Sequence, residues 1–322
     1  MNFLQSRCLL LVAYAGLLAG AASSCQVLRP TSHAADTANY CDLPRLYEVD
    51  TLRASVADPV PTDTIELPRL SARSRQLARA FGLGQGLRRL DHLERADQRA
   101  PNVPARDAYL SQRQHLITQV LLASAETLRV AEELDCEEQR ANQAAADLQR
   151  RENHQIRNLT IGSIAAGVGG GLAGELLETS TTEHALAVGG AIVSAGLGIA
   201  TLFVNPRQQF LHPRNLLADT WYYRSRSSLY PAGLWAVLSA PPAGAAQLAP
   251  LQTTRQRWLQ YDQLSGHDAP AQQMLYFGTG GRYDADELRT RSNMLGQLEG
   301  AVRLVNQDLQ QLLVELSNAE PR

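Results

Sequence analysis

The four cysteines are the residues whose chemistry the sequence specifies most closely. Cys8 lies in an apolar leader, and Cys25 follows three small residues at the end of that leader. If Cys8 leaves with the leader and a lipid consumes the Cys25 thiol, Cys41 and Cys136 remain as a pair, which favours a disulfide in an oxidising compartment. Two unpaired thiols are the alternative. The sequence therefore predicts lipidation at Cys25 and a disulfide between Cys41 and Cys136.

The segment before Cys25 has the layout of a secretory signal. Residues 1–7 carry one positive charge, and residues 8–22 form an unbroken run of apolar and small residues. The Ala-Ser-Ser sequence at 22–24 resembles a bacterial lipobox, with alanine where leucine is usual. We expect a signal peptide at 1–24. Cleavage after a nearby Ala-x-Ala sequence and an uncleaved anchor are the alternatives.

The lipid would attach the chain to the cell envelope. One acyl chain holds a membrane weakly, whereas the three chains of a bacterial lipoprotein anchor it stably. Gln26 follows the cysteine in place of aspartate, which resembles the pattern of outer-membrane lipoproteins. We therefore expect an outer-membrane lipoprotein that faces the periplasm, with membrane lipid as its partner through Cys25.

No other pattern predicts catalysis, a cofactor or a metal site. The seven histidines form no His-Glu-x-x-His pair, the cysteines lack zinc spacing, and there is no Gly-x-Ser-x-Gly elbow. The Gly-Thr-Gly-Gly sequence at 278–281 follows a stretch at 274–277 that we expect to be extended, but it lacks the lysine and the third glycine of phosphate-binding loops. Carboxylate pairs at 132–133 and 137–138 fall on a helix, where a solvated face is expected. We therefore expect that the protein has no enzymatic activity.

Composition places the chain among globular proteins. Of its 322 residues 44% are hydrophobic and 19% are charged, and a chain of this length can form a buried core. The 30 basic residues, all of them arginine, stand against 32 acidic ones and give a net charge of -2. Because a general nucleic-acid binder needs a basic face, nucleic acid is not an expected partner.

The elements that follow Cys25 are a tether and then helices. Residues 25–68 are rich in Pro, Thr, Asp and Ala without a sustained period, which predicts an extended, lipidated tether. Residues 69–157 read as a helical region, with two short helices over 71–100 and one long helix over 106–157, which contains no Gly or Pro. The predicted stripe of the long helix is Leu110, Ile117, Leu121, Leu128 and Ala131, continued after a phase slip by Leu134, Ala141, Ala145 and Leu148.

Residues 158–204 predict a glycine-zipper hairpin. Two apolar runs flank an acidic connection, and small residues stand four apart in both runs. Small residues at this spacing form a flat groove along one helix face, which lets a second backbone come close. The predicted helix-packing residues are Gly162, Gly167, Gly170, Gly171, Gly174, Gly190, Ser194 and Gly198.

The environment of this hairpin stays open. The second run has the length of a membrane span, whereas the first is shorter. Arginines flank the hairpin and its connection is acidic, so inner-membrane insertion after secretion would oppose the positive-inside preference. Insertion or oligomeric packing at the outer membrane and a dry hairpin within a helical bundle remain as alternatives.

The last two segments are helical by pattern. Residues 205–283 contain prolines that separate short helical stretches, and Trp221, Tyr222, Tyr223 and Arg224 could stack on a ligand or form the core and rim of a helical subdomain. Residues 284–322 form a coiled-coil-like helix that begins with the Asp284–Glu287 capping box. A heptad stripe alone does not choose its partner, so we expect packing on the long helix of the same chain, with a coiled-coil assembly surface as the alternative. The stripe is Leu288, Leu295, Leu298, Val302, Val305, Leu309, Leu312 and Leu316.

A lipobox-like Cys25 combined with this hairpin resembles the glycine-zipper outer-membrane lipoproteins, a group associated with envelope integrity. The chain is much longer than members of that group and adds long helices and a Trp-rich segment. The predicted fold is all-α, an elongated helical bundle or coiled coil with a central Gly-rich apolar helical hairpin.

The function that we predict is structural. Close-packing hairpins favour a homo-oligomer, or assembly with another envelope protein, at the outer membrane. A pore-forming or translocating helical protein is the first alternative, and a periplasmic ligand- or partner-binding module is the second.

Overall fold

A computed structural model describes residue 41 and residues 70–175, 180–244, 246–260 and 270–318, without the side chains of 170–187 and 270. These residues belong to one compact unit, Asn39–Arg322. The predicted signal peptide at 1–24, the lipidated Cys25 and the tether, apart from Cys41, lie outside the described residues.

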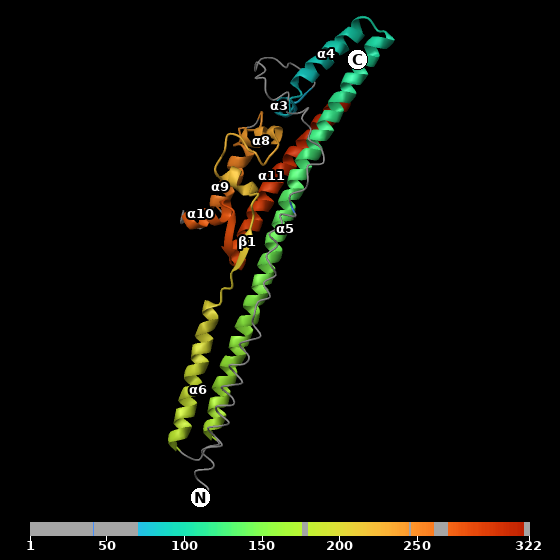
Figure 1. Ribbon diagram of the computed structural model, residues 1–322. Helices are drawn as coiled ribbons and strands as arrows, with labels where there is room; N and C mark the ends of the chain where they lie inside the picture. Colours follow the sequence, from blue (N-terminus) through green and yellow to red (C-terminus); the bar gives the residue numbers. More distant parts are fainter. Residues whose placement is uncertain (1–40, 42–69, 176–179, 245, 261–269, 319–322) are drawn as a thin grey trace. The chain divides into compact units, whose positions relative to one another are not determined.

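Helix α5 (Val103–Glu175, 73 residues) packs against α11 (Ala285–Ser317), α6 (Ser180–Ala200) and α4 (Gly84–Arg99). At 1.5 Å per residue it is about 110 Å long. We expected a boundary near 157–158, between a long helix and a separate hairpin helix, and this is wrong, because α5 passes through it without a break (Figure 1). Residues 105–161 contain no Gly or Pro, so no helix-breaking residue lies at the expected boundary.

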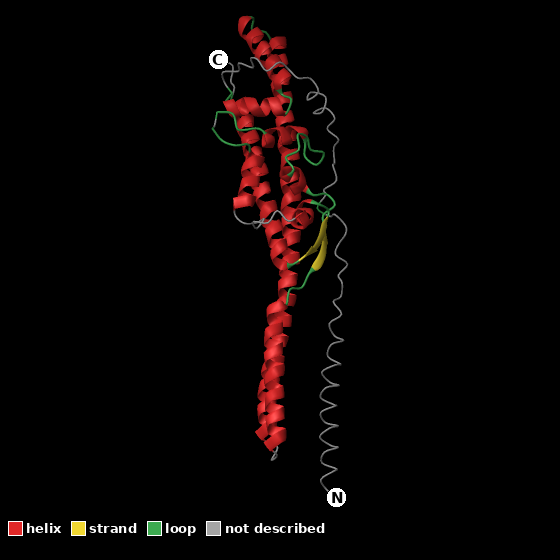
Figure 2. Cartoon of the chain, turned by 90° about the vertical axis from the view of Figure 1, so that its left-hand side faces the viewer, coloured by secondary structure: helices red, strands yellow, loops and turns green. Residues whose placement is uncertain are grey.

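Helix α11 (Ala285–Ser317) runs beside the N-terminal half of α5 (Figures 1 and 2). The predicted capping box is confirmed, since Asp284 accepts a hydrogen bond from the Glu287 amide and Glu287 accepts one from the Asp284 amide, both at 2.9 Å. Every residue of the predicted α11 stripe is buried, and the stripe faces the same chain. The prediction of intramolecular packing is therefore confirmed.

The buried face of α5 differs in part from the predicted one. Its N-terminal half buries Tyr109, Leu116, Val120, Ala123 and Val130, whereas the predicted Leu110, Leu121 and Leu128 are 41%, 49% and 38% exposed. The predicted Ala131 and Leu134 are buried. The two rows are neighbours on the helix, and the row with the small Ala123 and Thr127 lets α11 approach closely. Further along, Ala141, Ala145 and Leu148 are buried as predicted.

Two short helices, α3 (Ala72–Ala80) and α4 (Gly84–Arg99), confirm the prediction for 71–100. α4 packs on α5, and α3 packs on α11 and α8. Arg73 of α3 forms an ion pair with Asp308 of α11 at 2.7 Å, which adds a polar contact to the apolar one.

The segment between the hairpin and α11 forms a small subdomain. It contains η2 (Thr201–Phe203), β1 (Gln208–Leu211), α7 (Leu216–Trp221), α8 (Ala232–Ser239), α9 (Pro250–Gln260), α10 (Pro270–Phe277) and β2 (Gly280–Tyr283). The strands pair antiparallel, with Gln208 opposite Tyr283 and Leu211 opposite Gly280. The expectation of helices only was wrong here, as was the extended stretch at 274–277, which lies in α10.

Gly280 explains where β2 begins. Its φ of +99° is disfavoured for other residues, and a Cβ on it would lie 2.3 Å from the Phe210 carbonyl oxygen. Glycine therefore permits the close approach of the two strands. Apart from this strand pair the described chain is an all-α helical bundle, as predicted.

The contact of α11 with α5 gives the first testable prediction. Leu298→Ala removes a fully buried side chain and should lower the free energy of unfolding by about 2–5 kcal/mol, measured by denaturant titration. Leu304→Ala, at a position of α11 that is 61% exposed, should change it by less than about 0.5 kcal/mol. Equal losses from the two variants would contradict the assignment of the buried face.

Candidate functional site

The hairpin of α5 and α6 (Ser180–Ala200) is the candidate functional site, and its two helices lie side by side (Figure 1). The Ser163 hydroxyl donates to the Ser194 carbonyl at 2.9 Å, and the two hydroxyl oxygens are 3.1 Å apart. A Cβ on Gly167 would lie 3.3 Å from the Ser194 hydroxyl oxygen. Small residues therefore allow the two backbones to come close at this level.

The structure brings several of the predicted packing residues together. A Cβ on Gly162 would lie 3.5 Å from Leu197, and one on Gly198 would lie 4.0 Å from the Ser163 hydroxyl oxygen. With Gly167 and Ser194 they form a small-residue seam. Gly190 is half-buried, and the surroundings of Gly170, Gly171 and Gly174 lie outside the described side chains. Gly169, Gly189 and Gly196, by contrast, face open space.

Large apolar side chains lie on the outer edges of the hairpin. Ile161, Ile164 and Val168 of α5, here called the α5 row, are 58%, 61% and 57% exposed. Val188, Ile192 and Ile199 of α6, the α6 row, are 57%, 66% and 57% exposed. With 3.6 residues per turn, each row lies on the side of its helix opposite the seam. The hairpin thus carries one apolar row along each of its two outer edges.

These rows are the feature that the sequence reasoning missed. The sequence pattern that could have revealed them is the spacing of the large β-branched residues. They stand three and four apart in α5 and four and seven apart in α6, which places each set on one helix face. No charged residue interrupts 159–169 or 188–204. Exposed rows of large apolar side chains are typical of surfaces that contact another molecule.

Among the residues that the structure describes, no helix combines the length and the apolar composition needed to cross a membrane.

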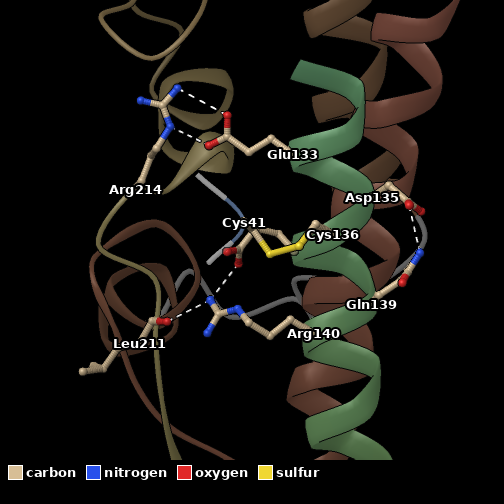
Figure 3. The surroundings of a disulfide bond; sticks show 9 residues. Cys41, Glu133, Asp135, Cys136, Gln139, Arg140, Leu211 and Arg214 are labelled. Carbon is tan, nitrogen blue, oxygen red and sulfur yellow. Dashed lines mark hydrogen bonds and ion pairs between the residues drawn. A yellow bond between two sulfur atoms is a disulfide. The ribbon is translucent and has the colours of Figure 1, made fainter. Parts of the chain in front are cut away.

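The subdomain is fixed to the middle of α5 by polar contacts near the disulfide (Figure 3). Cys41 and Cys136 are bonded, with Cα atoms 5.6 Å apart. One turn before Cys136, the Glu133 carboxylate accepts hydrogen bonds from Arg214, which also donates to the Leu229 carbonyl at 2.9 Å. One turn after Cys136, Arg140 donates to the Leu211 carbonyl at 2.9 Å.

The expectation of a solvated acidic face on this part of α5 is therefore wrong for two carboxylates. Glu133 and Glu137 are 1% and 3% exposed. Glu133 pairs with Arg214, and Glu137 accepts a hydrogen bond from Arg140 at 2.7 Å. Burying a carboxylate is tolerated when a cation compensates for its lost hydration. Arg214 lies far along the chain, so charge patterning along α5 did not reveal it, whereas Arg140 stands three residues from Glu137 on the same helix.

His212 is a buried titratable group at this junction with a lowered pKa. It is fully buried, and its Nε2 lies 2.9 Å from the Tyr283 hydroxyl. Burial, reinforced by the positive charges of Arg291 and Arg140, lowers the pKa of His212 to about 2. The imidazole is therefore neutral at physiological pH. With no solvent access and no pKa near neutrality, it is poorly suited to exchange protons with a substrate.

The proposed aromatic stacking residues are engaged within the subdomain. The ring of Trp221 stacks on Phe277 at 4.5 Å between centroids, and the guanidinium of Arg255 lies 4.8 Å from the Trp221 ring centre. Tyr222 and Tyr223 remain 51% and 41% exposed. Arg224 pairs with the buried Asp219 at 3.2 Å. The four predicted residues thus form no common ligand platform.

Within the described part of the chain, no group of His, Cys, Asp and Glu side chains has the arrangement of a metal site. No protein-family model, curated protein or solved structure matches the chain.

The seam gives a prediction with a closely matched control. Gly167→Leu should separate the helices and raise the rate of amide hydrogen exchange in α6, because its side chain meets Ser194. Gly169→Leu should leave α6 exchange unchanged, because no atom lies within 4 Å of its Cβ position. Both changes replace a helical glycine with leucine, so their effects on helix propensity match. Equal exchange in the two variants would refute the seam.

His212 predicts a pH dependence of stability. Because its folded pKa of about 2 lies below the ordinary 6.5, the unfolded chain binds the proton first, and stability is lost as pH falls below 6.5 toward 2. This group contributes a slope of up to about 1.4 kcal/mol per pH unit in the free energy of unfolding. His212→Gln should flatten the slope measured between about pH 6 and 4, whereas the exposed His154→Gln should not. Identical slopes would show that His212 is protonated in the folded protein.

Proposed function

We propose that the protein is an envelope lipoprotein with a structural, assembly role at the outer membrane, anchored by lipid at Cys25 and forming a homo-oligomer through the α5–α6 hairpin. The observation that carries this proposal is the pair of exposed apolar rows on the two outer edges of the hairpin. Burial of such rows is favourable by about 25 cal/mol per Å² of apolar surface removed from water.

A second copy of the chain suits these edges better than one unrelated partner. A partner bound to the α5 row would leave the α6 row in water, and the reverse also holds. Copies anchored in one membrane by the same residue point in the same direction. The α5 row of one copy can then lie against the α6 row of the next, which covers both rows with a single type of contact.

The direction of the helices supports this arrangement. α5 and α6 of neighbouring copies would run antiparallel, as they do within the hairpin. Within the hairpin, Gly162 lies opposite Leu197 and Gly167 lies opposite Ser194. The same register between copies sets Val168 level with Ile192 and Ile161 level with Ile199. Each of these pairs joins two β-branched side chains.

Cysteine cross-linking in membranes tests the proposal. Val168→Cys and Ile192→Cys are made as two separate variants. Each variant keeps the native Cys41–Cys136 disulfide. Under mild oxidation we expect dimers when the two variants are co-expressed and none when either is expressed singly. Val168→Cys with Ile199→Cys is the control, because these positions lie about two helical turns apart in height and should not cross-link.

The other outcomes have definite meanings. Dimers of Val168→Cys expressed singly would show two copies joined by their α5 rows, which keeps self-assembly and rejects the alternating arrangement. Absence of cross-links in every combination, with the protein folded and in the membrane, would reject self-assembly through the hairpin.

A further inference from the structure

Two exposed side chains, Arg157 of α5 and Phe203 of η2, lie at the end of the hairpin that joins the subdomain. Phe203 is 79% exposed, although η2 itself packs against α5, and its ring contacts no aromatic or cationic group among the described residues. Arg157 is exposed, and within the described chain no hydrogen bond or ion pair holds its guanidinium. The hairpin therefore presents a free ring and a free cation near the same end.

Both side chains extend the apolar rows by about one helical turn. Arg157 stands four residues before Ile161, the first member of the α5 row, and Phe203 stands four residues after Ile199, the last member of the α6 row. Residues four apart lie on one side of a helix. Arg157 therefore belongs to the outer edge of α5, and Phe203 belongs to the outer edge of α6.

Neighbouring copies would bring the two side chains together. This step rests on the proposed function, in which the α5 row of one copy lies against the α6 row of the next. The register that sets Ile161 level with Ile199 also sets Arg157 level with Phe203, because the two helices run antiparallel and each position moves by one turn. Helices in contact have axes about 8–10 Å apart, a distance that an extended arginine side chain can cross.

We infer that Arg157 of one copy binds the face of the Phe203 ring of the next, and that this contact determines which edges of the hairpins meet. A guanidinium within about 6 Å of a ring centre is attracted by the negative face of the ring. Two α5 rows of copies pointing in one direction would instead set Arg157 against Arg157, and like charges across a contact oppose association. Two α6 rows would pair two rings without a cation. The alternating contact gives each Arg157 a ring.

The surroundings of Phe203 do not repel a cation. Arg207, the next arginine along the chain, forms ion pairs with Asp284 at 3.2 Å and with Glu287 at 3.4 Å. Its charge is therefore compensated within its own chain. The guanidinium of Arg157 can approach the ring without meeting an uncompensated positive charge from this residue.

Cysteine cross-linking in membranes tests the position of the pair. Arg157→Cys and Phe203→Cys are made as separate variants and co-expressed, so that a disulfide between them joins two chains. Under mild oxidation we expect dimers, and none from Arg150→Cys with Phe203→Cys, because Arg150 lies about 10 Å further along α5. Dimers from Val168→Cys with Ile192→Cys but none from Arg157→Cys with Phe203→Cys would overturn the inference and leave the proposed function standing. Absence of dimers from both combinations would reject the proposed function as well.

The chemistry of the contact is tested by the rate at which Val168→Cys and Ile192→Cys cross-link at low expression, where assembly is incomplete. Phe203→Leu keeps an apolar side chain and removes the ring, and it should lower the initial rate about two- to fivefold. Arg157→Gln should lower it by the same factor. The two changes together should lower it no further than either alone, because they remove the same contact. A combined loss equal to the product of the two single losses would show that the residues act independently, which would overturn the inference.

Two matched controls exclude general effects of substitution at this end of the hairpin. Leu202→Ala changes the adjacent position, which is 80% exposed, and Arg150→Gln removes a charge that is paired within its own chain, with Asp147 at 3.1 Å. Neither control should change the rate of cross-linking. A rate that falls equally in the controls, or that stays unchanged in both Phe203→Leu and Arg157→Gln, would contradict the cation–π contact.

Discussion

The uninterrupted helix α5 is the constraint on which the rest of the structure depends. Its N-terminal half is covered by α11, and its C-terminal half is covered by α6. A single helix therefore carries two interfaces of different composition. Against α11 it presents large side chains such as Leu116 and Leu134, which remove much apolar surface from water. Against α6 it presents Ser163 and Gly167, which gain contact by close backbone approach.

The two interfaces also differ in how much large apolar surface they leave exposed on α5. In the N-terminal half, large interlocking side chains bury much apolar surface within the chain, although Leu110, Leu121 and Leu128 remain 41%, 49% and 38% exposed. A seam of glycine and serine occupies little surface, so the large side chains of the hairpin remain outside it. Between the two halves, Glu133 and Arg140 fix the subdomain through directed polar contacts that also specify its position on the helix.

Elements governed by local rules could be predicted from the sequence. The capping box at Asp284 and the heptad stripe of α11 depend on neighbouring residues, and both are present. The buried row of α5 was mispredicted in its first half because two adjacent rows are apolar and only the position of α11 decides between them. The strand pair and the burial of Glu133 required partners distant in sequence, Gly280 and Arg214, which no local pattern identifies. For the hairpin, small-residue spacing indicated the seam, but the outer rows emerged only from solvent exposure.

The Cys41–Cys136 disulfide also limits the distance between Cys25 and helix α5. In a chain anchored at Cys25, the bond leaves about 16 residues between the lipid and α5, which extend to at most about 55 Å. Without it, the first fixed point would be near Leu70, about 45 residues from the lipid, with a reach of roughly 150 Å. From Cys136 to Glu175, α5 itself measures about 58 Å. In a chain anchored at Cys25, the disulfide would therefore keep Cys136 within about one hairpin length of the lipid.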